Sequence, residues 1–183
     1  MRVAVIGAGP AGLMAAEVLA AGGAQVDVFD AMPSAGRKFL MAGKGGLNIT
    51  HAEPFEDFLT RYGESRRWIE PLLLAFPPSR LREWMHGLGV ESFVGSSGRV
   101  FPSEMKAAPL LRAWLQRLRA SGVRLHMRHR WLGWVDRACL FHTPEGERRI
   151  EMDAVVLALG GGSWARLGSD GAWVPLLQQQ GVD

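Results

Sequence analysis

Three glycines near the N-terminus have the spacing that brings a peptide backbone against a phosphate. Gly7, Gly9 and Gly12 spell the pattern G-x-G-x-x-G directly after an apolar run. The first glycine of such a pattern permits a tight strand-to-helix turn, the second lets the backbone approach a pyrophosphate, and the third lets the helix lie close to the strands. The N-terminus of the helix then faces the anion. Alone, the triplet is a weak signal, because a glycine turn without a nucleotide can have the same letters.

The segments around the triplet strengthen it. Arg2–Ile6 is typical of a buried parallel strand, Ala11–Ala21 is rich in helix formers and stops at two glycines, and Gln25–Phe29 alternates as a second strand. Asp30 ends that strand, close to the separation of about 20 residues expected for a carboxylate that accepts ribose hydroxyls. The same carboxylate would repel a 2′-phosphate, so an adenosine half without one, as in FAD or NAD, is favoured over NADP.

Later segments predict how this βαβ unit grows into a sheet. An amphipathic helix is predicted over Ala108–Ala120, and buried strands over Val123–Met127 and Ala154–Leu159. The fold class is α/β, a Rossmann-like doubly wound parallel sheet, with a three-stranded antiparallel layer as its last crossover. The predicted order of the parallel strands is Val123–Met127, Gln25–Phe29, Arg2–Ile6, Ala154–Leu159. The antiparallel strands are predicted over Trp131–Asp136, Cys139–Thr143 and Arg148–Met152, with a turn at Pro144–Glu147.

The middle of the chain is expected to be mostly helical. A glycine-rich stretch from Pro33 to Thr50 has too few regular signals for an ordinary element, and a loop of this length usually has a function. Further helices are predicted over Pro54–Tyr62, Arg66–Ala75, Ser79–Leu88, with Ser79 as a possible cap, and Val174–Gln180.

Composition narrows the class of protein. With 183 residues, 48% hydrophobic and 21% charged, the chain is expected to form one structural unit around a core. The net charge of +3 is weak evidence for nucleic acid as a partner. The single cysteine, Cys139, predicts a reducing cytoplasm, and no apolar run reaches the roughly 18 residues of a membrane span. The five histidines have no metal-binding spacing, so we expect no metal site.

One basic cluster leaves two interpretations open. Arg124, Arg128 and Arg130 alternate with His126 and His129 as side chains on one face of a strand would. The cluster could form a solvated sheet edge or a phosphate contact, and we favour the solvated edge.

The glycine-rich stretch resembles a known family. Residues 36–50 read G-R-K-F-L-M-A-G-K-G-G-L-N-I-T, and the segments Gly98–Pro102, Leu157–Gly161 and Gly168–Gly171 agree with the same pattern. Together they resemble the BaiN/YhiN-like flavoproteins, some of which are aminoacetone oxidase-like, over nearly the whole chain. One departure is Leu47, where many relatives carry a cysteine; cysteine-dependent chemistry at that position is therefore in doubt.

The resemblance implies a glutathione-reductase-like FAD-binding domain over residues 1–183. It implies that Arg37 and Lys38 lie near the flavin or its phosphates, and that Gly43, Gly45, Gly46 and Asn48 shape the isoalloxazine pocket. In full, the predicted cofactor-binding residues are Gly7, Gly9, Pro10, Ala11, Gly12, Asp30, Ala31, Gly36, Arg37, Lys38, Gly43, Gly45, Gly46, Asn48, Trp131, Ala158, Gly160 and Gly161.

Two parts of this set have alternative interpretations. Ala158, Gly160 and Gly161 follow a parallel strand at its carboxyl end, where nucleotides lie in such sheets, although a plain tight turn also uses glycines. Trp131 occupies the position of a main-chain contact to adenine in proteins of this fold, with its ring expected to pack rather than react. Arg99 is a candidate substrate-binding residue, or a surface hairpin arginine.

The predicted function is that of an FAD-dependent oxidoreductase that transfers a hydride through flavin N5 on a small organic substrate. NAD(P)H and oxygen are both candidate electron partners, and no catalytic acid or base is assigned. The alternative is a nucleotide-binding module without turnover, because in the family the chain continues into a substrate-capping domain and a returning FAD segment. A flavoprotein acting on RNA is a third, weaker hypothesis. Gly181–Asp183 is interpreted as a cap and the start of a new strand, and we expect the isolated 183 residues to hold FAD poorly.

Overall fold

A computed structural model describes residues 1–182 of the chain. The contacts divide it into two compact units: unit 1 is Met1–Phe39 together with the chain from Gln116 on, and unit 2 is Leu40–Leu115. This differs from the one structural unit expected from the chain length, because the middle of the chain builds a small sheet and core of its own.

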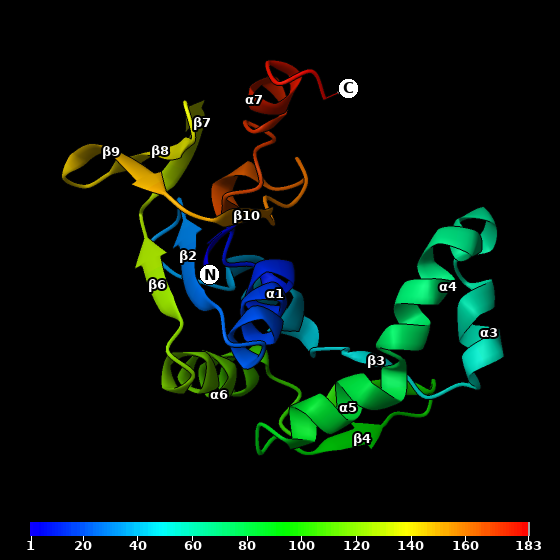
Figure 1. Ribbon diagram of the computed structural model, residues 1–183. Coiled ribbons are helices and arrows are strands. Elements are labelled where there is room, and N and C mark those ends of the chain that lie inside the picture. The colour runs from blue at the N-terminus through cyan, green and yellow to red at the C-terminus, as the bar shows by residue number, and fades with distance from the viewer. Residues whose placement is uncertain (183) are drawn as a thin grey trace. The chain divides into compact units, whose positions relative to one another are not determined.

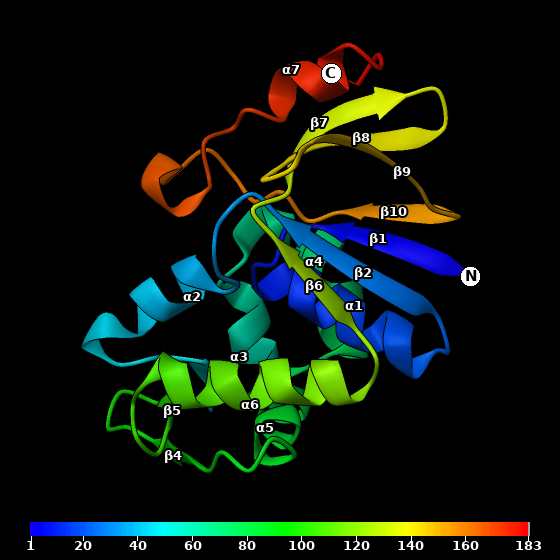
Figure 2. The ribbon, with the colours of Figure 1, turned by 90° about the vertical axis from the view of Figure 1, so that its left-hand side faces the viewer.

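Unit 1 is centred on a four-stranded parallel sheet in the order β10-β1-β2-β6. Its strands are β1 (Arg2–Ile6), β2 (Gln25–Asp30), β6 (Arg124–Met127) and β10 (Ala154–Leu157). Figure 2 shows the four strands lying side by side. The observed strand order confirms the one predicted from the sequence. Residues 3–6 of β1 and 26–29 of β2 are buried, as in a sheet covered on both faces.

Helix α1 (Pro10–Ala21) joins β1 to β2 and packs on both strands. Gly9 is its N-cap and Pro10 occupies the first turn, where the missing N–H of proline costs nothing. Leu13 and Ala16 on its inner face are buried. The helix gives way to Gly22 and a left-handed Gly23, as the sequence predicted.

An antiparallel sheet forms the second layer of unit 1. Its strands are β7 (Arg130–Val135), β8 (Ala138–Thr143) and β9 (Gly146–Glu151), in the order β7-β8-β9. The predicted layer is confirmed, although β9 starts at Gly146, so the turn is shorter than Pro144–Glu147. Phe29 of β2 stacks on Phe141 of β8 with ring centroids 4.4 Å apart, which joins the two sheets through one core. Burial raises the pKa of the Cys139 thiol in this core, in keeping with a packing role.

The basic cluster divides into two parts. Arg124 and His126 point from β6 toward Asp27 of β2, which is only 3% exposed. Arg124 Nε donates to Asp27 Oδ1 over 2.8 Å, and His126 Nε2 lies 2.7 Å from the same oxygen. Arg128 has a left-handed backbone (φ 60°) in the turn before β7, which breaks the predicted alternation.

Acid stability should report on this buried carboxylate. Burial raises the pKa of Asp27, but hydrogen bonds from Arg124 and His126 outweigh burial and leave the pKa below its ordinary value. A carboxyl with a depressed pKa in the folded state contributes stability above its unfolded pKa and loses it as the pH falls toward the folded pKa. We therefore expect urea unfolding of wild type to lose stability as the pH falls below about 4, and Asp27→Asn to remove that part of the pH dependence. Equal acid limbs in the two proteins would contradict this assignment.

Unit 2 contains helices and a small antiparallel sheet that the sequence did not predict. Its helical elements are α2 (Arg37–Ala42, which starts in unit 1), α3 (Phe55–Thr60), α4 (Arg66–Ala75), α5 (Pro78–His86) and the first part of α6 (Ala107–Ala120), which Figure 1 labels from α3 on. The sheet has the order β3-β5-β4, from β3 (Thr50–His51), β4 (Ser92–Val94) and β5 (Arg99–Pro102). The buried residues of unit 2 include Val100 of β5 and Leu110 and Trp114 of α6.

Two expectations for this unit were wrong. The stretch after Pro33 is not irregular throughout, since α2 and a short 3-10 turn at Gly43–Gly45 lie within it. Ser79 does not cap α5: Pro77 is the N-cap and Pro78 begins the helix, because a proline is well accommodated in a first turn. Among residues 1–182, no helix has the length and apolar character needed to cross a membrane.

Candidate functional site: a cavity in unit 1

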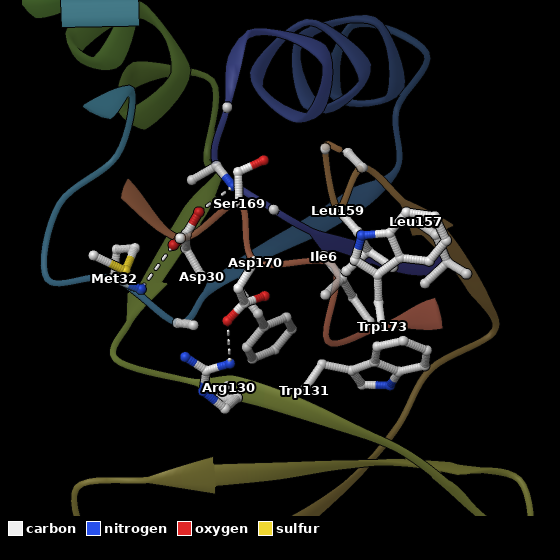
Figure 3. A pocket seen from close by; sticks show the side chains of 18 of the residues that line it. Ile6, Asp30, Met32, Arg130, Trp131, Leu157, Leu159, Ser169, Asp170 and Trp173 are labelled. Atoms are coloured by element: carbon white, nitrogen blue, oxygen red, sulfur yellow. Dashed lines mark hydrogen bonds and ion pairs between the residues drawn. The ribbon is translucent and has the colours of Figure 1, made fainter. Parts of the chain in front are cut away.

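A cavity of about 530 Å³ opens at the carboxyl ends of β1, β2 and β10. Figure 3 shows residues of its wall, among them Asp30, Trp131, Ser169 and Asp170. This is the edge at which open parallel sheets bind ligands. The predicted cofactor-binding residues that line the cavity are Gly7, Gly9, Pro10, Ala11, Asp30, Ala31, Gly36, Arg37, Lys38, Trp131, Ala158 and Gly160.

The three fingerprint glycines have different physical roles. Gly7 has φ +113°, and a Cβ there would lie 2.2 Å from the Ala158 carbonyl oxygen. A Cβ on Gly12 would lie 1.8 Å from the Gly7 carbonyl oxygen, so both positions are fixed by packing of the backbone itself. A Cβ on Gly9, by contrast, would meet nothing within 4 Å. Gly9 therefore keeps space in the cavity free, while Gly12 serves the fold.

Asp30 is held rigidly at the end of β2. Its Oδ2 accepts a hydrogen bond from the Ala8 N–H over 2.7 Å, and its Oδ1 accepts one from the Met32 N–H over 2.8 Å, as Figure 3 shows. Each carboxylate oxygen has a further lone pair. The side chain is thus fixed in the cavity wall with acceptor capacity left for hydroxyl groups.

Two cations at the start of α2 form another part of the wall. Arg37 Nε is buried and has no hydrogen-bond partner among the described residues. Lys38 Nζ lies 2.9 Å from Ser169 Oγ and 3.4 Å from Ser163 Oγ. A buried N–H donor without an acceptor is costly, so the Arg37 guanidinium is suited to an anionic ligand.

The loop after β10 completes the cavity. Ala158 N–H donates to the Ile6 carbonyl over 2.8 Å and so continues the sheet, and Gly160 has a left-handed backbone. Gly161 does not line the cavity; its carbonyl accepts the Ser169 hydroxyl. Gly168–Gly171 is part of the pattern that resembles the family, but the spacing of its residues gives no role to Ser169 or Asp170, because their partners lie far away along the chain.

Trp131 contributes its ring to the core, as expected. It is 6% exposed and packs edge to face on Trp134 with centroids 4.7 Å apart. The indole N–H groups of Trp131 and of Trp173, another residue of the wall, have no hydrogen-bond partner among residues 1–182.

The remaining predicted site residues, Gly43, Gly45, Gly46 and Asn48, lie in unit 2, and their contacts are within that unit. A Cβ on Gly43 would lie 2.5 Å from Ala107 Cβ, and Gly46 has φ +111°, so the fold of unit 2 gives each position its own reason for a glycine. Gly45 has open space where a Cβ would stand. Asn48 Nδ2 donates to the carbonyls of Thr50 and Val100 over 2.7 and 3.2 Å, which fixes the loop to β5.

Arg99 lies on β5, where it pairs with His51 of β3 and is exposed. Leu47, the departure from the family pattern, is 4% exposed and packs inside unit 2. Within the described part of the chain, no group of three or more His, Cys, Asp or Glu side chains could hold a metal ion.

The sheet order, the glycine turn between β1 and α1, and the carboxylate at the end of β2 define a Rossmann-type domain. The chain belongs to the HI0933-like protein family, whose Rossmann domain matches residues 1–183. The family resemblance inferred from the sequence, to flavoprotein oxidoreductases of the BaiN/YhiN type, is confirmed.

Two curated relatives are oxidoreductases. The chain is 30% identical over 183 residues to the 3-dehydro-bile acid delta(4,6)-reductase of Clostridium scindens, a match that covers 98% of this chain and 44% of that protein. It is 35% identical over 127 residues to the D-amino acid dehydrogenase of Dechloromonas aromatica, covering 65% of this chain and 29% of that protein. The chain therefore spans less than half the length of the curated relatives it matches.

Solved structures agree on the fold. The 3-ketosteroid-delta4-(5alpha)-dehydrogenase of Rhodococcus jostii RHA1 superposes with a TM-score of 0.69 at 16% identity, over 99% of this chain and 54% of that one. THI4 of Thermovibrio ammonificans superposes with a TM-score of 0.59 at 19% identity, over 100% of this chain and 63% of that one. At these sequence identities the structural similarity confirms the predicted α/β fold class and gives no information about substrates.

Proposed function

We propose that residues 1–183 act as the FAD-binding domain of an oxidoreductase. The observation that carries the proposal is the cavity in which open space at Gly9, a fixed Asp30 carboxylate and the unpartnered Arg37 Nε meet. These groups match, in kind, the pyrophosphate and ribose of a dinucleotide.

Different groups of the chain would bind different parts of the cofactor. Asp30 would accept the adenosine ribose hydroxyls, and its charge would exclude a 2′-phosphate. The first turn of α1 would face the pyrophosphate, with Gly9 leaving room for the approach, because a helix N-terminus favours negative charge. Arg37 and Lys38 would supply compensating positive charge from the other part of the wall.

When bound, the flavin would supply hydride transfer through N5. The chain would hold and orient it, and a nearby cation such as Lys38 would favour the reduced, anionic ring. The relatives act on a 3-dehydro-bile acid and on D-amino acids, by their names. We propose a small organic substrate for this protein and NAD(P)H as one candidate electron donor.

The experiment is an absorption spectrum of the purified chain after incubation with FAD and gel filtration. With FAD also present in the column buffer, since the isolated 183 residues are expected to hold FAD poorly, we expect flavin bands above the buffer level to co-elute with the chain. Bleaching on addition of NADH or NADPH would identify the electron donor. Absence of co-eluting FAD, or retention of NAD but not of FAD in a parallel sample incubated with NAD, would contradict the proposal.

Asp30→Ala should weaken FAD binding. The change removes charge-assisted hydrogen bonds, each worth about 1.5 to 3 kcal/mol, so the dissociation constant should rise roughly 10- to 100-fold. Fluorescence titration with FAD measures this change. Asp136→Asn, a carboxylate outside the cavity wall on a left-handed residue that asparagine tolerates, is the control and should bind as wild type does. An unchanged dissociation constant for Asp30→Ala would count against ribose recognition.

A nucleotide-binding module without turnover is the second candidate. The observation that favours it is that Asp30, Lys38 and Asp170 of the cavity wall are all engaged in hydrogen bonds within the chain. None of the three is poised to exchange protons with a substrate. Stoichiometric FAD binding without bleaching by any donor would support the module.

A further inference from the structure

One segment of the cavity wall is tied down at two neighbouring residues. We call residues 163–170, between β10 and α7 (Val174–Gln178), the strap. Ser169, which is 3% exposed, accepts a hydrogen bond from Lys38 Nζ over 2.9 Å and donates to the Gly161 carbonyl. The next residue, Asp170, forms an ion pair with Arg130 Nη1 of β7 at 3.2 Å, which Figure 3 shows.

The backbone of the strap is ordered around these two anchors. Trp164 and Ser169 form a bridge, with N–H to carbonyl distances of 3.1 and 3.2 Å in the two directions. Gly168 is left-handed, and a Cβ there would lie 2.6 Å from Met32 Cγ, so the strap lies close to the segment that follows Asp30. Lys38, Met32, Arg130, Ser169 and Asp170 all line the cavity.

The two anchors differ in character. The Ser169 contact is buried, and the hydroxyl is engaged on both sides. The Arg130 and Asp170 side chains are 47% and 33% exposed, so their attraction is screened by salt. Hydrogen bonding from the Ala172 N–H, together with Arg130, keeps the pKa of Asp170 below its ordinary value, so the carboxylate stays charged near neutral pH.

We infer that Ser169 and Asp170 are positioning residues that hold the strap against a bound dinucleotide, and that opening the Arg130–Asp170 ion pair sets the rate at which the cofactor leaves. The inference rests on the proposed function for the identity of the ligand. The anchors themselves are properties of this chain. A strap fixed on two sides of the wall would restrict the exit of a ligand bound in the cavity.

The rate of FAD release tests the inference. The chain is loaded with FAD and diluted into an excess of ADP, which prevents released FAD from binding again. The change in flavin fluorescence over time then gives the release rate. We expect release to be about two- to fivefold faster in Asp170→Asn, as for a partly exposed ion pair, and about tenfold faster in Ser169→Ala, which loses a charge-assisted hydrogen bond. Asp136→Asn is the matched control and should release FAD at the wild-type rate.

Salt separates a positioning role from a merely structural one. Between about 0.05 and 1 M NaCl, FAD release should accelerate in both proteins, because salt also screens the attraction between the pyrophosphate and the cations of the wall. The acceleration should be larger in wild type than in Asp170→Asn, which has no Arg130–Asp170 ion pair left to screen. A lower melting temperature of Asp170→Asn with unchanged release and unchanged salt dependence would overturn the inference and leave the ion pair a structural contact.

Hydrogen exchange tests the strap when FAD does not bind. In the chain without cofactor, the amides of Trp164, Ser169 and Ala172 are hydrogen-bonded and should be protected. Ser169→Ala and Asp170→Asn should each accelerate exchange of residues 163–172 and leave β8 unchanged. Rapid exchange of this segment in wild type would overturn the strap itself, whereas protection without FAD binding would contradict only the proposed function.

Discussion

Gly9→Val should weaken FAD binding about a hundredfold while leaving the fold intact. Gly9 has φ −79° and ψ −179°, an extended conformation that valine adopts readily, and a Cβ there meets nothing within 4 Å. The new side chain would fill the space that we assign to the pyrophosphate. An overpacked contact of this kind costs on the order of 3 kcal/mol, or about a hundredfold in the dissociation constant. Fluorescence titration with FAD and thermal melting of the same sample measure both effects.

Ala21→Val is the matched control for that variant. It adds the same branched side chain at the exposed far end of α1. We expect this control to bind FAD as wild type does. Tight FAD binding by Gly9→Val would mean that the fingerprint has been misinterpreted, and loss of the cooperative melt would mean that Gly9 is needed by the fold.

Gly12→Ala, in contrast to Gly9→Val, should lower the stability of the folded chain. A Cβ on Gly12 would lie 1.8 Å from the Gly7 carbonyl oxygen and 3.2 Å from Ala158 Cβ, so α1 must move away from β1 and β10. Overpacking against backbone costs about 3 kcal/mol or more. For a chain of this size that corresponds to a fall of roughly 10 °C in the melting temperature.

Gly9→Ala provides the comparison for this second variant. It places the same methyl group three positions earlier, in open space, and should melt at the wild-type temperature without cofactor. Equal melting temperatures for Gly12→Ala and wild type would show that the helix can shift at little cost, and would remove the packing explanation for Gly12.

The parallel sheet could be predicted because its signals are local and strong. The strands β1 and β10 are continuous apolar runs, as expected of strands inside a parallel sheet, and residues 25–28 of β2 alternate between polar residues and valine. The glycine turn and Asp30 were found for a similar reason, since a fixed backbone geometry demands fixed residue types at fixed spacing. The order of the strands followed from the preference for right-handed crossovers.

Unit 2 could not be predicted in the same detail. The strands β3, β4 and β5 have two to four residues each, too few for alternation to stand out. Gly43 and Gly46 were assigned to a cofactor by resemblance, whereas contacts with Ala107 and Met105 give each glycine a packing reason as well. Such contacts join residues far apart along the chain, and spacing alone does not reveal them.

The same limit applies to the strap. Arg130 and Asp170 are 40 positions apart, and Lys38 and Ser169 are 131 positions apart. The sequence contains the motif around Ser169, but its spacing does not indicate that Lys38 and Arg130 are the partners of Ser169 and Asp170. Only the folded chain brings the four side chains to one cavity.

Competition between ligands for the cavity shows whether it recognises the adenosine pyrophosphate of FAD. The chain is titrated with FAD, and the bound flavin is then challenged with ADP, which contains the adenosine and pyrophosphate, or with FMN, which lacks both. If the groups at Gly9, Asp30 and Arg37 recognise the adenosine pyrophosphate, FAD binds saturably, ADP displaces it, and FMN at the same concentration does not. Displacement by FMN but not by ADP, or FAD binding that never saturates, would contradict the assignment of this cavity.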